Sequence, residues 1–177
     1  MRHSDAKRLG HISEMELADA QIQDLAFQLL TIYYADAPIK RLLAKYAYDG
    51  IECCFDEIKN GKITLLLVQI ASLHRIRHWT ETKQTKVRVR DAEVGTWFVE
   101  GREEDIALTM LEACNKIIHA DRMKLEARKV RKSGFHYFRD WIVIEGSKAK
   151  KRWAAHLSVT QFCDAAMFGL DWEDVPF

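Results

Sequence analysis

The stretch Ile106-Ala107-Leu108-Thr109-Met110-Leu111-Glu112-Ala113-Cys114-Asn115-Lys116-Ile117-Ile118-His119-Ala120 carries the clearest helical pattern in the chain. On a helix, which turns by about 100° per residue, its apolar side chains gather on one arc that should face a core. Asn115 and His119 are four residues apart, so they should lie one above the other at the edge of this arc, on either side of Leu108. The pattern predicts a helix over residues 106–120 that presents an amide and an imidazole where the core meets water or a partner.

Three further helices are expected in the first half of the chain. Ser13 is a good N-cap for a helix that should run to about Tyr34. Pro38 suits the first turn of a second helix, expected over residues 38–58. Asn60-Gly61 is a turn signal, and the apolar run that follows predicts a central helix over residues 63–79.

Strand patterns come later in the chain. Aromatic and β-branched residues over 136–145 and 152–159 predict a β-hairpin around a loop at 146–151. A short strand is expected over residues 95–99, paired with a loop or edge strand over 85–89, and Thr160 should cap a last helix through Phe168. The predicted fold is mainly α, a helical bundle of four or five helices with a C-terminal β-hairpin. It should form a single domain over residues 1–177, with a flexible arm over residues 1–11.

The composition limits the possible functions. The chain has 177 residues and a net charge of +1, so its overall charge predicts no strong affinity for polyanions. Its cations gather in three segments, residues 80–90, 122–132 and 148–152, a pattern that suits an RNA-facing groove and equally suits solvated loops. The four cysteines show no CxxC spacing, which favours free thiols in a reducing cytoplasm. The longest apolar run, residues 63–73, is too short to span a bilayer.

The sequence motifs predict neither a cofactor nor a metal. A Gly-rich phosphate loop, a nucleophile elbow and paired carboxylates are all missing, which argues against phosphate-loop enzymes, α/β-hydrolases and dinucleotide oxidoreductases. His74 and His78 are spaced one helical turn apart and could bind zinc with a third ligand, but no HExxH carboxylate accompanies them. Basic residues at this place also suit the C-terminal end of a helix dipole.

The spacing of Asn115 and His119 resembles the second half of the HEPN motif, which runs arginine, polar residue, three residues, histidine. HEPN domains are small helical bundles, often dimeric; many are metal-independent ribonucleases, and others only bind RNA or a partner. In this chain Asn115 matches the polar position and His119 the histidine, while Cys114 stands at the arginine position. Because cysteine supplies no fixed positive charge to a phosphate, this departure supports RNA binding better than catalysis.

The resemblance implies roles for the residues of this helix. His119 would act as general base or acid on the ribose 2′-hydroxyl and the leaving oxygen, and Asn115 would position it. The missing cation would come from Lys116, Arg75 or Arg77. Further contacts to nucleic acid are expected from the cationic segments and the end of the central helix: Arg75, Arg77, His78, Lys86, Arg88 and Arg122. Tyr137, Trp141 and Trp153 could stack on bases or pack against the bundle.

Two functions remain open from the sequence. The first is a cytoplasmic, HEPN-like RNA-directed protein, either a metal-independent ribonuclease or an RNA binder. The alternative is a non-enzymatic homodimeric module for protein interaction. We expect a homodimer in which Leu108, Asn115 and His119 lie near the interface or line the cleft that it creates; otherwise Leu108 packs against the C-terminal hairpin and the chain is monomeric.

Overall fold

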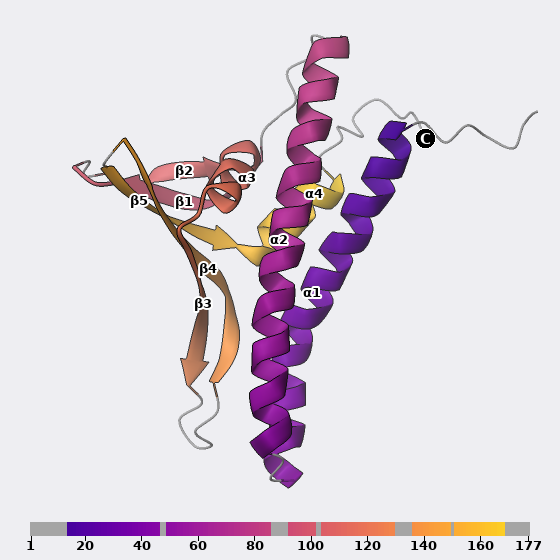
Figure 1. Cartoon of the computed structure of the whole chain (residues 1–177), viewed down its shortest axis with the longest axis vertical. Coiled ribbons are helices and arrows are strands. Elements are labelled where there is room, and N and C mark those ends of the chain that lie inside the picture. Colours follow the sequence, from indigo (N-terminus) through magenta and orange to yellow (C-terminus); the bar gives the residue numbers. More distant parts are fainter. Residues whose placement is uncertain are drawn as a thin grey trace, which may run out of the picture.

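The computed structural model describes residues 14–46, 49–85, 92–101, 104–129, 136–149 and 151–168. Two long helices, α1 (Glu14–Tyr46) and α2 (Asp49–Thr85), pack along each other on one side of a twisted sheet (Figure 1). The other elements follow in the order β1 (Glu93–Val99), β2 (Ile106–Thr109), α3 (Met110–Ile118), β3 (Arg122–Lys129), β4 (His136–Lys148), β5 (Lys151–Ser158) and α4 (Val159–Phe168). The predicted arm over residues 1–11 lies outside the described residues.

The sheet has five antiparallel strands in the order β2-β1-β5-β4-β3. The predicted helical bundle with a minor hairpin is therefore wrong, because β1, β2 and β3 extend the β4–β5 hairpin on both sides. β3 lies in a segment that the sequence marks only as basic. There, exposed Arg122 and Lys124 alternate with half-buried Met123 and Leu125, which is the pattern of a strand with one face on a core.

One face of the sheet carries the core. The strand register places Trp97 opposite Ala155, Ala155 opposite Ile144, and Ile144 opposite Met123, so these side chains share a face. They join one apolar cluster with side chains from all four described helices. The opposite face of the sheet is open, and large side chains there remain exposed.

Both long helices continue through signals that predict helix ends. Pro38 lies inside α1 and Asn60-Gly61 lies inside α2, so the predicted boundaries at these places are wrong. The physical reason is tertiary burial, since Asp36 and Lys40 are buried on either side of Pro38 and Lys59 is buried beside Asn60. Packing between the two helices outweighs the local preference for a break.

A buried cluster of charges joins the helices to the sheet. Lys59 forms ion pairs with Asp36 and, at 2.6 Å, with Asp56. Lys40 adds an ion pair with Asp56 at 3.3 Å, and the backbone N–H of Phe138 on β4 donates to Asp36 at 2.8 Å. Burial alone would raise the pKa of Asp56, but the hydrogen bond and charge of Lys59 and the charge of Lys40 hold it below its ordinary value.

The predicted helix over residues 106–120 is a strand followed by a shorter helix. Residues Ile106–Thr109 pair with β1 as β2, and Thr109 caps α3 by accepting a hydrogen bond from the Glu112 N–H at 3.4 Å. Leu108 is fully buried in the strand. It therefore shares no helical face with the two polar residues of the motif and cannot supply the apolar patch of the expected dimer.

The C-terminal hairpin, the strand over residues 95–99 and the last helix are confirmed. β1 pairs with β2 and β5. Its expected partner was the segment 85–89, of which Thr85 is the last residue of α2 and residues 86–89 lie outside the described part. Ser158, not Thr160, caps α4, because its hydroxyl accepts from the Gln161 N–H at 3.2 Å. None of the described helices is long and apolar enough to cross a membrane.

Candidate functional site

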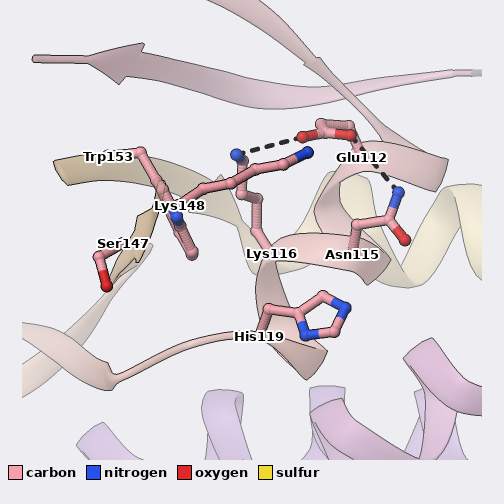
Figure 2. A pocket seen from close by; sticks show the side chains of 7 residues that line it. All are labelled: Glu112, Asn115, Lys116, His119, Ser147, Lys148 and Trp153. Carbon is pink, nitrogen blue, oxygen red and sulfur yellow. Dashed lines mark hydrogen bonds and ion pairs between the residues drawn. The ribbon is translucent and has the colours of Figure 1, made fainter. Parts of the chain in front are cut away.

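A pocket of about 500 Å³ lies between α3 and the β4–β5 hairpin (Figure 2). Its size is within the usual range for small-molecule sites. The structure brings the three residues predicted to be catalytic into this α3 pocket and adds four others. It is lined by Glu112, Asn115, Lys116, His119, Ser147, Lys148 and Trp153.

The carboxylate of Glu112 binds two of the predicted residues. Lys116 forms an ion pair with it at 3.2 Å, and the Asn115 side chain donates a hydrogen bond to it at 3.4 Å. Both contacts follow from helix geometry, since residues three and four positions apart are neighbours on a helix surface. Asn115 is thus tied to Glu112, and the charges of Glu112 and Lys116 offset each other.

Lys116 is held between two tryptophan rings. Its Nζ lies 3.7 Å from the ring centroid of Trp97 and 4.3 Å from that of Trp153, and its side chain is buried. Such cation–π contacts stabilise a desolvated ammonium by about 2 kcal/mol. Lys116 therefore anchors α3 to the core face of the sheet, and it would have to leave both rings and Glu112 to reach a phosphate.

Trp153 keeps its place because of Gly146 on the neighbouring strand. The two residues are register partners, and a Cβ added to Gly146 would lie 2.2 Å from Cζ2 of Trp153. Only glycine leaves room for the indole ring at this position. The ring is thus confined between Gly146 on one side and the ammonium of Lys116 on the other.

His119 lies at the rim of the pocket. It is the C-cap of α3, and its backbone N–H donates to the carbonyl oxygen of Asn115 at 3.1 Å. Its side chain is exposed, and Figure 2 shows the imidazole pointing away from Glu112 and Lys116. His119 can therefore meet a ligand from solvent, but it makes no proton-transfer pair with Glu112.

Lys148 is the most available cation of the pocket. It lies at the end of β4, and in Figure 2 its side chain extends across the pocket toward the side where Glu112 lies. The ion pairs recorded among the described residues do not include Lys148, and its side chain is exposed. Its ammonium is free to bind an anionic ligand.

The predicted cations of α2 do not reach the pocket. Arg77 is buried and forms an ion pair with Asp19 of α1 at 3.1 Å, so it joins the two long helices. Arg75 is exposed and His78 half-buried on α2, and neither lines the pocket. His74 is buried, and no group of three or more metal-ligating side chains gathers in the described part of the chain.

The other predicted nucleic-acid contacts divide into two groups. Lys86 and Arg88 lie outside the described residues. Arg122 begins β3 and lines a second pocket, of about 480 Å³, which shares Ser147 and Trp153 with the first. This second pocket is lined by Phe98, Asp121, Arg122, Glu145, Gly146, Ser147, Arg152, Trp153 and Ala154.

No family model, curated protein or solved structure matches the chain. The assignment of the site therefore depends on its own residues. Glu112 could have been found from sequence, because it precedes Asn115 and Lys116 by three and four positions. Lys148 and Trp153 had no such signal, since they reach α3 only through the pairing of the sheet.

Proposed function

We propose that the protein binds single-stranded RNA and holds a phosphate group of the strand in the α3 pocket. The observation that carries this proposal is the charge of the pocket. Glu112 and Lys116 form a neutral pair, which leaves the unpaired ammonium of Lys148 as the net charge. Asn115 and His119 add N–H donors beside it. A concave site with a positive potential and several donors suits a phosphate.

The geometry favours binding over cleavage. Metal-independent cleavage of RNA needs one group that removes the proton of the 2′-hydroxyl and another that protonates the leaving oxygen. His119 can fill one of these roles, but the carboxylate of Glu112 is engaged with Lys116 and Asn115. A HEPN-like catalytic role for His119 therefore stays a prediction. The cytoplasmic location expected from the sequence also stays a prediction.

Binding is tested by fluorescence anisotropy with a labelled twelve-nucleotide oligouridine. Lys148→Ala should weaken binding about tenfold, as expected for the loss of one charge-assisted contact. It should also reduce the slope of the logarithm of the binding constant against the logarithm of the salt concentration by about one, because one phosphate contact is lost. Lys62→Ala is the matched control, since Lys62 is an exposed lysine of α2 outside the pocket. Wild-type protein that shows no salt-dependent binding would refute the proposal.

Cleavage is tested on the same RNA without divalent metal. If His119 transfers a proton, His119→Ala should lose at least a hundredfold in the rate measured at saturating protein, beyond any loss of binding from the missing N–H donor. Intact RNA after prolonged incubation with wild-type protein would leave the protein as a binder. Equal cleavage by the variant would exclude His119 from the reaction.

A second candidate function, the protein-interaction module, is favoured by exposed apolar side chains on α2. Ile58 and Leu65 are seven residues apart, so they lie on one stripe, and they are 72% and 50% exposed. Ile76 and Trp79 continue the exposed apolar surface toward the end of the helix. Light scattering at micromolar concentration tests this function: a dimer that Leu65→Lys dissociates supports it, and a monomeric wild type contradicts self-association.

A further inference from the structure

The open face of the sheet carries three rings on a diagonal. The register places Phe98 of β1 opposite Ala154 of β5, and Val143 of β4 opposite His156 of β5. His156 is two residues beyond Ala154, and Trp141 two residues before Val143, so Phe98, His156 and Trp141 share this face. Each step along the diagonal moves to the neighbouring strand and two residues along it, which corresponds to about 8 Å.

These three residues, called here the ring platform, are accessible to a ligand. Phe98 is 42% exposed and Trp141 38% exposed, and His156 is half-buried between them. Large aromatic side chains that are exposed together on an open sheet face are typical of a surface that a ligand or partner covers. The spacing of the rings is comparable to that of successive bases in an extended single strand, and aromatic rings on a sheet can stack such bases.

Cations on the same face could bind the phosphates of such a strand. Arg122 and Lys124 of β3 face outward beside β4, and Arg152 lies two residues before Ala154 on β5. The recorded ion pairs of the described residues include none of these three. Carboxylates also lie on this face: Glu145 is opposite Arg122 in the register, Asp121 lines the same pocket, and the carboxylate of Glu100 accepts from the Arg152 backbone N–H.

Of these three cations, Arg152 is the most informative about a ligand. Lysine and arginine on an edge strand such as β3 also prevent pairing with other sheets, so these residues alone would not indicate a ligand. Arg152 belongs to β5, the central strand, where that explanation does not apply. Its backbone N–H donates to Glu100 at 3.2 Å, and its guanidinium forms no ion pair with another described residue.

The second pocket connects this face to the α3 pocket. It contains Phe98, Arg122 and Arg152, and it shares Ser147 and Trp153 with the α3 pocket. A single-stranded RNA whose phosphate lies near Lys148 can therefore continue past the β4–β5 hairpin onto the ring platform. This continuity, together with the cations, favours a nucleic acid as the occupant over an apolar protein segment.

We infer that the ring platform is the base-binding surface for single-stranded RNA, with Phe98, His156 and Trp141 stacking on bases and Arg122, Lys124 and Arg152 contacting phosphates. The inference rests on the proposed function, whose phosphate site it extends to several nucleotides. A duplex should bind more weakly, because its bases are already stacked and cannot reach the rings. The preference for single strands is thus a direct consequence of the platform.

The test uses the full chain and the labelled twelve-nucleotide oligouridine. The double variant Phe98→Leu and Trp141→Leu keeps apolar side chains but removes the flat rings, and it should weaken binding at least tenfold. Phe27→Leu is the matched control, since Phe27 is 66% exposed on α1 and lies away from the sheet face. Circular dichroism melts of all variants establish that the fold is retained.

The outcomes separate this inference from the proposed function. Weaker binding by both the platform variant and Lys148→Ala supports both. Unchanged binding by the platform variant, with weaker binding by Lys148→Ala, overturns the platform and keeps the α3 pocket. The reverse result supports the platform and overturns the pocket. Equal affinity for a duplex of the same length, or a loss with Phe27→Leu equal to that of the platform variant, also overturns the platform.

Discussion

Replacing Gly146 by alanine should destabilise the protein strongly although it adds only one methyl group. The new Cβ would lie 2.2 Å from Cζ2, 2.7 Å from Cε2 and 2.9 Å from Cη2 of Trp153. To restore an ordinary contact, the ring must move by about 1 Å, and the ammonium of Lys116 lies 4.3 Å from its centroid. Overpacking costs about 1–3 kcal/mol and a weakened cation–π contact about 1 kcal/mol more, so the free energy of unfolding should fall by about 2–4 kcal/mol.

Gly61→Ala supplies the matched control for this measurement. Gly61 lies inside α2, and a Cβ added there meets no atom within 4 Å. Alanine at this position should raise the free energy of unfolding by about 0.5–1 kcal/mol, because it restricts the unfolded chain and favours helix. Urea denaturation of the three proteins gives the comparison. A Gly146→Ala protein as stable as wild type, or shifts of the same sign in both variants, would refute the packing argument.

Two other predictions concern buried groups. Lys59→Met should lower the free energy of unfolding by about 3–5 kcal/mol, because it leaves the buried carboxylate of Asp36 without its nearest cation; a thermal melt that shows a loss below about 1 kcal/mol would contradict this. Burial, and then the charge of Asp140, raises the pKa of the Cys163 thiol from 9.0 to about 12. The folded state then holds this proton more tightly than the unfolded state, so the stabilisation is complete below pH 9 and is lost as the pH rises toward 12. The urea midpoint of the wild type should therefore be lower at pH 10.5 than at pH 8, and the difference should be smaller in Cys163→Ala. The same difference in both proteins would refute the assignment.

Local signals in the sequence were sufficient for some elements and misleading for others. The hairpin of β4 and β5 was predictable because aromatic and β-branched residues fill both strands. β2 was not, since four residues, Ile106–Thr109, satisfy a helical and a strand pattern equally and only pairing with β1 decides between them. Pro38 and Asn60-Gly61 are strong local break signals, but burial between α1 and α2 overrides them.

The candidate site was predictable to the extent that it lies on one helix. Asn115, Lys116 and His119 were found because they are close in sequence and polar on an apolar background. The engagement of Lys116 by two tryptophans was not predictable, because Trp97 and Trp153 come from different strands that meet only in the folded sheet. The partner that neutralises Lys116 lies on the same helix and can be read from the sequence, whereas the two rings that enclose its ammonium cannot.

The strand order also determines how the entropy of closing the sheet is distributed. Three of its four ladders, β1–β2, β3–β4 and β4–β5, join strands that follow one another in the chain. The fourth, β1–β5, pairs Gly95 with Leu157 and spans everything between them. Because the entropic cost of closing a loop grows with its length, this ladder is the most expensive to form. The sheet thus consists of a local hairpin and a local three-stranded meander, and the β1–β5 ladder is the single set of backbone hydrogen bonds that makes them one sheet.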